Sequence, residues 1–191
     1  KIVIIGQSAF GRSVMEAIAD AGKDEIVGAF PPADREGRPL DPVKEGALER
    51  SIPVHQHGKY RSEESIAAFR ALDADLCVMA FVTDIVPDDM IEAPNLGTIQ
   101  YHPSLLPKPR GPSSINWPII YGETETGLTI FWPDKGLDTG PVLMQNNAEI
   151  EPDETLGSLY FNKLYPLGVE ALIESVDLVR TGNAPKIVQD E

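Results

Sequence analysis

Residues 1–11, KIVIIGQSAFG, decide the class of fold. Residues 1–5 form an unbroken apolar run, which is the pattern of a strand buried on both faces of a parallel sheet. The turn that follows offers Ser8 as an N-cap for a helix that extends to about Ala21. A second strand is predicted over residues 25–30, so the chain opens with a β-α-β unit whose crossover should be right-handed. The sequence therefore predicts an α/β fold with a Rossmann-like, mostly parallel sheet flanked by helices.

The same turn raises the question of a dinucleotide site. Gly6, Ser8 and Gly11 have the spacing of the G-x-G-x-x-G fingerprint. Ser8, however, replaces the glycine that lets the backbone approach a pyrophosphate, and the second strand ends at residues 30–32 without the acid that binds a ribose. A tight structural turn is the favoured interpretation, and an NAD-dependent oxidoreductase stays a distant alternative.

Apolar periodicity continues along the chain, and we expect a single domain over residues 1–191. Further strands or extended segments are expected over residues 52–55, 75–80, 98–101, 126–132 and 141–150. Further helices are expected over residues 42–50, 63–72, 88–91 and 156–180, and from a cap at Ser113 or Ser114 to Tyr121. Pro166 should kink or divide the helix over residues 156–180, because proline has no backbone N–H to donate.

Composition excludes some classes of function. The formal charge of −14 at pH 7 argues against non-specific nucleic-acid binding, because phosphate contacts need clustered Lys and Arg. No apolar run approaches membrane-spanning length, so no membrane partner is expected. The single cysteine, Cys77, lies in an apolar run and cannot form an internal disulfide, which fits a reducing compartment. We therefore expect a soluble, cytoplasmic protein.

Two polar segments each follow a predicted strand. The strand over residues 98–101 leads to His102, in a segment that Pro103 and Pro107 prevent from becoming helix. His102 is thus placed at the carboxyl end of a strand, where open α/β sheets bind their ligands. The second segment, residues 134–140, contains Asp138. An imidazole can donate, accept or carry a proton near neutral pH, and a carboxylate can orient it. We predict that His102 and Asp138 meet in one cleft and act on a carbonyl group.

Each of these residues also has a simpler interpretation. His102 could be structural, and Asp138, between two glycines, could be a turn residue that bonds backbone amides. Lys108 and Arg110 form a local positive island, which is either a solvated loop or a site that captures an anionic substrate tail.

Two further groups of residues leave similar choices. Residues 81–87 follow another strand and either line a pocket or cap the core. His55 and His57 have no further Cys or His nearby, so solvated loop histidines are a better interpretation than a metal site.

Two long motifs, HPSLLPKPRGP at residues 102–112 and GLDTGPVL at residues 136–143, resemble the signature of enzymes that use 10-formyltetrahydrofolate. That superfamily includes glycinamide ribonucleotide formyltransferase, methionyl-tRNA formyltransferase and the amino-terminal hydrolase domain of 10-formyltetrahydrofolate dehydrogenase. The similarity covers nearly the whole chain and is strongest to the hydrolase domain, with matching motifs at residues 6–11, 101–107, 113–117 and 130–140.

The resemblance implies roles for particular residues. His102 and Asp138 would be catalytic, and no metal would be needed. Main-chain groups around Asp84, Ile85 and Val86, together with the loop over residues 134–138, would hold the pterin of the folate. The full set of candidate substrate-binding residues is Phe81, Asp84, Ile85, Val86, Leu105, Lys108, Arg110, Asp134, Gly136 and Leu137.

One position departs from the family pattern. The transferases have an asparagine two residues before the histidine and the hydrolase domain has an aliphatic residue, whereas this chain has Gln100. A glutamine amide can still donate, but its extra methylene moves the donor by about one bond length, and oxyanion donors must lie roughly 2.7–3.1 Å from the developing charge. Gln100 is therefore a third candidate catalytic residue, and the identity of the formyl acceptor stays open.

The resemblance thus predicts an enzyme of one-carbon metabolism that removes the formyl group of 10-formyltetrahydrofolate, with hydrolysis to tetrahydrofolate and formate preferred. Transfer to an amine (methionyl-tRNA, a nucleotide-sugar or a small amine) is the alternative, and a non-catalytic folate-binding module is a more distant one. The acidic composition makes tRNA the least favoured acceptor. Relatives continue into a β-rich carboxyl-terminal domain, which we expect to be absent from this chain. If the chain is part of a longer protein, we expect its partners to include the further domains of that protein.

Overall fold

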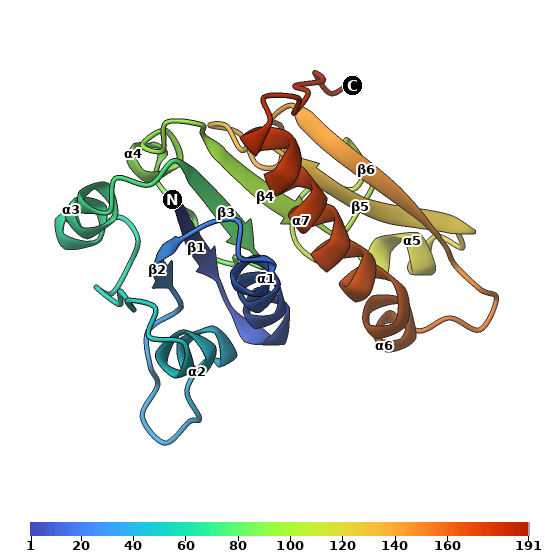
Figure 1. The fold of residues 1–191 in the computed structure, drawn as a ribbon. Coiled ribbons are helices and arrows are strands. Elements are labelled where there is room, and N and C mark those ends of the chain that lie inside the picture. Colours follow the sequence, from blue (N-terminus) through green and yellow to red (C-terminus); the bar gives the residue numbers. More distant parts are fainter. Residues whose placement is uncertain (191) are drawn as a thin grey trace. The chain divides into compact units, whose positions relative to one another are not determined.

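The computed structural model describes residues 1–190, and its strands form a six-stranded sheet in the order β2-β1-β3-β4-β5-β6 (Figure 1). β1 pairs in parallel with β2 and β3, whereas β5 is antiparallel to β4 and β6. The predicted α/β class, with a mostly parallel sheet and flanking helices, is confirmed. The strands are β1 (Ile2–Gly6), β2 (Ile26–Phe30), β3 (Leu76–Ala80), β4 (Thr98–His102), β5 (Glu125–Phe131) and β6 (Val142–Glu149).

By its internal packing the chain divides into two compact units, Lys1–Ile99 and Gln100–Glu191. The assignment of residues 1–191 to a single catalytic domain stays a prediction. Within residues 1–190, no helix combines the length and the apolar character needed to cross a membrane.

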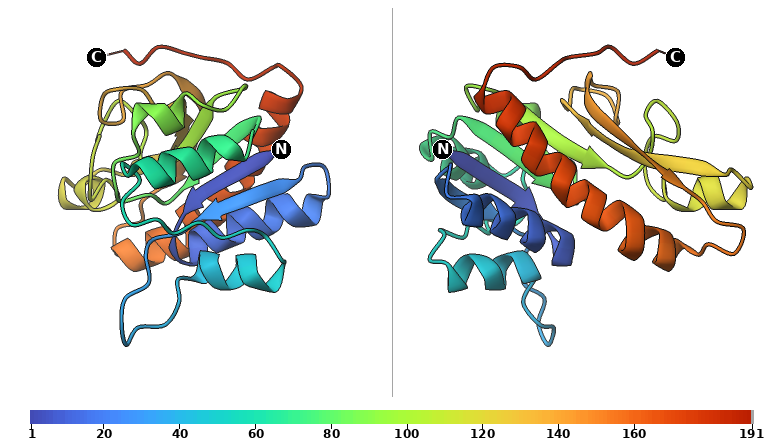
Figure 2. Two further views of the ribbon diagram at one scale, coloured as in Figure 1. Left: turned by 90° about the vertical axis from the view of Figure 1, so that its left-hand side faces the viewer. Right: turned by 45° about the vertical axis from the view of Figure 1, so that its right-hand side comes forward.

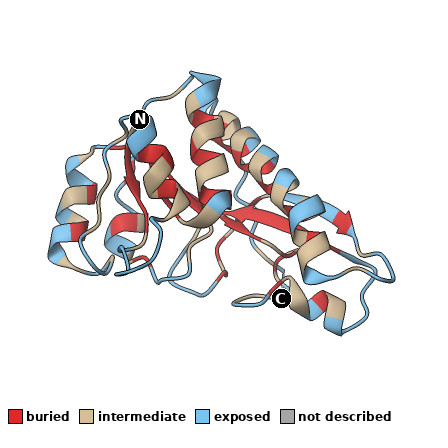
Figure 3. Ribbon diagram, turned by 90° about the horizontal axis from the view of Figure 1, so that it is seen from below, coloured by how far each residue is buried: buried red, intermediate tan, exposed pale blue. Residues whose placement is uncertain are grey.

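The first unit is built on β1. Every residue of β1 and β3 is buried, as their continuous apolar runs predict, and Figure 3 shows the strands mostly in the colour of buried residues. Val3, Ile5, Phe30, Phe69 and Met79 belong to one core cluster of this unit. The helices of the unit are α1 (Ser8–Ala21), α2 (Pro42–Glu49), α3 (Glu63–Ala71) and α4 (Asp88–Ile91).

The start of α1 differs from its prediction. Ser8 is the first helical residue, with a positive φ of 62°, and the N-cap is Gln7, which makes no side-chain capping bond. The Ser8 N–H instead donates to Asp41 Oδ2 at 2.9 Å, while Asp41 Oδ1 caps α2 by accepting from Val43 N at 2.9 Å. One carboxylate, distant in sequence, thus serves both helix starts.

The glycine that ends β1 is explained by close packing. A Cβ at Gly6 would lie 2.5 Å from the Ala80 carbonyl oxygen, so no ligand is needed to account for a glycine here.

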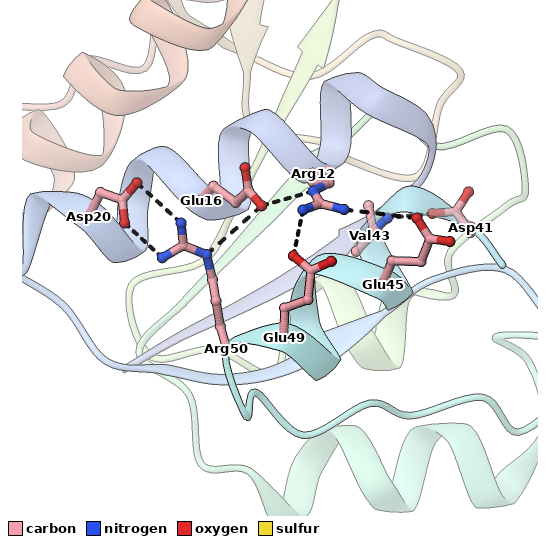
Figure 4. A network of polar contacts seen from close by, with 8 residues as sticks. All are labelled: Arg12, Glu16, Asp20, Asp41, Val43, Glu45, Glu49 and Arg50. Carbon is pink, nitrogen blue, oxygen red and sulfur yellow. Dashed lines mark hydrogen bonds and ion pairs between the residues drawn. The ribbon is translucent and has the colours of Figure 1, made fainter.

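Ion pairs join α1 to α2 and to the residue that follows it (Figure 4). Arg12 Nε donates to Glu16 at 2.8 Å and Arg12 Nη2 donates to Glu49 at 2.6 Å. Arg50 Nη1 and Nη2 donate to the two carboxylate oxygens of Asp20, at 2.7 and 3.2 Å. Because these groups lie near the surface, solvent screens each pair and its contribution to stability is small.

The second unit is built on β5, which lies between β4 and β6. Helix α7 packs against β5 and β6, and Figure 2 shows its long run from two sides. The predicted cap of the first helix is wrong: that helix begins at Asn116, after Ile115, with no side-chain capping bond. The helical elements are α5 (Asn116–Ile120), α6 (Leu156–Leu159), the π-helical turn η1 (Tyr160–Leu164) and α7 (Tyr165–Arg180).

The helix predicted over residues 156–180 is divided, as Pro166 requires. Pro166 lies in the first turn of α7, directly after η1. Because proline offers no N–H, the preceding turn lacks one ordinary α-helical bond and widens into a π-helical turn. The run starts with a capping box, in which the Thr155 and Ser158 side chains each accept from the other's backbone N–H.

Candidate active site

His102 is the last residue of β4 and is buried, with 5% of its surface exposed. Its Nε2 lies 3.0 Å from the Pro109 carbonyl oxygen, which also accepts a hydrogen bond of 2.7 Å from Ser104 Oγ. The imidazole and the ring of Phe131 on β5 are perpendicular, with ring centroids 6.5 Å apart. The loop that follows β4 therefore folds back so that its own backbone contacts the histidine.

Asp138 lies on the loop after β5 and is 8% exposed. Its Oδ2 is 3.5 Å from His102 Nδ1 and accepts a hydrogen bond of 2.8 Å from Gly111 N. The residue has a positive φ of 55°, a conformation that costs energy in a non-glycine residue and that the surrounding contacts must hold. The structure thus brings together the imidazole and the carboxylate that the sequence singled out. The Gly111 N–H holds the carboxylate in place.

Both ring nitrogens of His102 face oxygen acceptors, Pro109 O on one side and Asp138 Oδ2 on the other. A neutral imidazole can donate to only one of them, whereas an imidazolium can donate to both. The 3.5 Å separation from Asp138 is longer than an ordinary hydrogen bond of about 2.7–3.2 Å. Contacts of this kind are often loose in a free enzyme and shorten when the substrate binds.

Thr129, which sequence reasoning missed, holds the loop after His102. The side chain of this fully buried residue of β5 donates to Ser104 O at 2.7 Å and accepts from Leu106 N at 3.1 Å. Gln145, its register partner on β6, donates through Nε2 to Thr129 Oγ1 and to Leu106 O, both at 2.9 Å. A threonine inside an apolar strand, opposite a glutamine, was the available signal.

The loop over residues 134–140 is shaped from within. Asp134 Oδ1 accepts from Gly136 N at 3.0 Å and from Thr139 Oγ1 at 2.6 Å. A Cβ at Gly140 would collide with the Trp132 carbonyl oxygen, so the glycine is required by the close approach of two backbone segments. Leu137 is exposed. Asp134 and Gly140 therefore organise the loop that carries Asp138.

The other candidates of this unit are in different surroundings. Gln100 is partly buried on β4, in register with Phe131. Leu105 packs closely over Gly127, and Lys108 is exposed. Arg110 donates to Gln189 Oε1, from Nε at 3.2 Å and from Nη2 at 2.8 Å.

The candidates of the first unit follow β3. Phe81 has a positive φ of 58°. Val86 is buried in the core cluster of that unit, whereas Asp84 and Ile85 are exposed. Val86 therefore caps the core, while a pocket-lining role for Asp84 and Ile85 stays a prediction.

The histidines of the first unit do not both fit their interpretation as solvated loop residues. His57 is exposed, but His55 stacks on Phe30 with ring centroids 4.9 Å apart. Burial lowers the pKa of His55, and the nearby His57 lowers it further.

Across residues 1–190, no group of three or more His, Cys, Asp or Glu side chains is arranged to hold a metal ion.

The family model described as Formyl transferase matches residues 1–176. The chain belongs to the formyl transferase family. The resemblance inferred from residues 102–112 and 136–143 is thereby confirmed.

Members of the formyl transferase family match the whole of this chain. It is 40% identical over 196 residues to mitochondrial 10-formyltetrahydrofolate dehydrogenase from Homo sapiens, covering 100% of this chain and 21% of that protein. It is 39% identical over 196 residues to methionyl-tRNA formyltransferase from Trichlorobacter lovleyi, covering 100% of this chain and 61% of that protein. The chain thus spans 21%, about a fifth, of the length of the dehydrogenase.

A solved formyl transferase shares the fold. The N-formyltransferase from Helicobacter canadensis, in complex with folinic acid and dTDP-3-aminofucose, superposes with a TM-score of 0.77 at 22% identity. The superposition covers 100% of this chain and 68% of that one. The predicted fold of a formyltransferase catalytic domain therefore agrees with a known member.

Proposed function

We propose that this chain binds 10-formyltetrahydrofolate and releases its formyl group through His102 and Asp138, with water as the acceptor. The observation that carries the proposal is the buried pair itself, 3.5 Å apart, in a chain of the formyl transferase family. A carboxylate beside an imidazole in a buried setting is an arrangement suited to proton transfer and to stabilising an oxyanion.

In the hydrolytic reaction, Asp138 accepts a proton from water as the water oxygen bonds to the formyl carbon. His102 Nε2, which faces Pro109 O without substrate, would donate instead to the formyl oxygen as negative charge develops there, which lowers the barrier. The carbon–nitrogen bond then breaks as the folate nitrogen takes the proton that Asp138 received, passed on through His102. Tetrahydrofolate and formic acid leave, and the formic acid ionises to formate. The Gly111 N–H, which already donates to Asp138, keeps the carboxylate turned toward the imidazole.

Transfer to an amine is the second candidate. It is favoured by the 39% identity to a methionyl-tRNA formyltransferase, which is nearly equal to the 40% identity to the dehydrogenase. An amine nitrogen would replace the water oxygen and become the new formamide, and the roles of His102 and Asp138 would be unchanged.

Several other features of the proposal stay predictions. Gln100 would donate a further hydrogen bond to the formyl oxygen. The other candidate substrate contacts named from the sequence are untested, as is a cytoplasmic location. Relatives named mitochondrial and cytosolic match the chain equally well, each at 40% identity.

Incubation with 10-formyltetrahydrofolate tests the proposal. Release of formate and tetrahydrofolate with no added acceptor supports hydrolysis, whereas turnover only after a primary amine is added supports transfer. His102→Asn should lower turnover by about 10²–10⁴-fold, the usual contribution of a general acid or base. His57→Asn is the matched control, because His57 is exposed and outside the pair. Wild-type turnover in His102→Asn would remove the assignment.

A further inference from the structure

We propose that Gln189 is a positioning residue for Asp138, holding the two loop segments that fix the carboxylate. This inference rests on the proposed function, because Gln189 would act on the reaction only through Asp138. It concerns a residue outside both family motifs, near the end of the described chain.

The amide of Gln189 bridges the two segments. Its Nε2 donates to Asp138 O at 2.9 Å and to Gly140 O at 2.8 Å. Its Oε1 accepts from Arg110 Nη2 at 2.8 Å. Arg110 directly precedes Gly111, whose N–H donates to Asp138 Oδ2. One side chain therefore connects the backbone of Asp138 with the segment that holds its carboxylate.

These neighbours fix which way the amide faces. Two carbonyl oxygens on one side can only accept, and a guanidinium on the other side can only donate. The amide nitrogen must therefore face Asp138 and Gly140, and the amide oxygen must face Arg110. Gln189→Glu would set a negative oxygen against two carbonyl oxygens, and Gln189→Ala would remove the contacts on both sides.

The segment around Gln189 is held in place independently of its side chain. The Trp132 indole N–H donates to Pro185 O at 2.9 Å. Val142 and Ile187 exchange both backbone hydrogen bonds, at 2.7 and 2.9 Å. Among residues 185–190, Gln189 alone is partly buried while the others are exposed. Its side chain can therefore be changed without removing the contacts that anchor the segment.

The hydrogen bonds of Gln189 hold a part of the backbone that is in an unfavourable conformation. Asp138 has a positive φ, and such a conformation persists only where the surroundings hold it. Gln189 bonds the carbonyl of Asp138 itself and that of Gly140, two residues on. Without these bonds the loop should sample other conformations, in which the carboxylate leaves Gly111 and His102. A misplacement of about 1 Å can lower a rate by about a hundredfold.

The test compares Gln189→Ala and Gln189→Glu with Val188→Ala, a matched control whose side chain is 80% exposed. Turnover of 10-formyltetrahydrofolate gives kcat and KM, with formate or formylated amine as product. Hydrogen exchange of the Gly111 amide, followed by NMR without substrate, reports on the bond to Asp138. Thermal melting confirms that each variant is folded.

We expect both Gln189 variants to lose at least about tenfold in Gly111 protection and in kcat, because the carboxylate is no longer held in place. Val188→Ala should behave as the wild type in both measurements. In an Asp138→Asn background, Gln189→Ala should lower kcat no further, since the group that it positions is already gone.

Unchanged Gly111 exchange in both Gln189 variants would overturn the inference, and so would lost protection with wild-type kcat. An additional loss in the Asp138→Asn background would also overturn it, by showing an effect that bypasses Asp138. Wild-type turnover in Asp138→Asn alone would instead contradict the proposed function. The exchange of Gly111 would then decide by itself whether Gln189 positions Asp138.

Discussion

His102 has an oxygen acceptor beside each ring nitrogen, and this determines what the residue can do. Pro109 O and Asp138 Oδ2 can each accept a hydrogen bond, so the ring can donate from either nitrogen. The Asp138 carboxylate, beside Nδ1, keeps the ring oriented. Ser104 donates to the same Pro109 carbonyl, so that acceptor is fixed in place before any substrate arrives.

His55 illustrates a different use of an imidazole. It stacks on Phe30, and within residues 1–190 its buried Nε2 has no hydrogen-bond partner. Burial, which disfavours the charged form, lowers the pKa of His55. The folded state therefore favours the neutral ring. The stability that this contributes is fully present above the pKa that His55 has in the unfolded chain. That contribution is lost as the pH falls from the pKa of His55 in the unfolded chain to its lower pKa in the folded protein.

An NMR titration of the His55 ring checks this. The midpoint should lie below the usual value of about 6.5. In His55→Phe, which keeps the stacking partner without the titrating group, the free energy of unfolding should decrease less as the pH falls below that value. A midpoint at or above the usual value would contradict the assignment.

At the scale of elements, the site depends on the pairing of β5 with β6. Thr129 and Gln145 face each other across that pair, and together they bond the backbone of the loop that leaves His102. The loop contains Pro103, Pro107 and Pro109, which cannot donate backbone bonds of their own, so side chains must hold it.

Thr129→Val keeps the shape of the side chain and removes its hydroxyl. Ser104 O and Leu106 N would then lose a buried partner, and each unsatisfied group costs about 1–3 kcal/mol. With two such groups, we expect the free energy of unfolding to fall by about 2–6 kcal/mol in urea titrations, together with turnover. Thr124→Val, at an exposed position, is the control. Wild-type stability in Thr129→Val would show that the loop is held by other means.

Thr155 makes a separate prediction for the divided helix. It accepts from Ser158 N at 3.1 Å and caps the run that continues into η1 and α7. Thr155→Ala should lower the free energy of unfolding by about 0.5–2 kcal/mol, and Thr155→Ser, which restores the acceptor, should recover most of the loss. Equal stability of the two variants would contradict a capping role.

At the scale of the whole molecule, the elements followed from local patterns. The apolar runs of β1 and β3, the division of the last helix at Pro166, and the proximity of His102 to Asp138 were all anticipated from residue order. The cap of α1 was not, because its acceptor is Asp41, in the segment before α2. Gln189 was missed for the same reason, since its partners lie in segments distant along the chain.

Burial in the first unit gives a test of the fold in solution. Cys77, the one cysteine of the sequence, is fully buried in β3, and burial raises the pKa of its thiol. A thiol must ionise and be accessible to react. The native chain should therefore resist a thiol reagent, and one equivalent should react after denaturation. Rapid labelling of native protein would show that β3 is not buried in this way.

The central claim is that His102 and Asp138 act as one unit on a formyl group. Its most direct test measures tetrahydrofolate release from 10-formyltetrahydrofolate, with and without a primary amine, for the wild type, His102→Ala, Asp138→Ala and the double variant. Each single change should lower the rate by about 10²–10⁴-fold, and the double variant should be no slower than the worse single one. Effects that multiply in the double variant, or near-wild-type release in either single variant, would contradict the account.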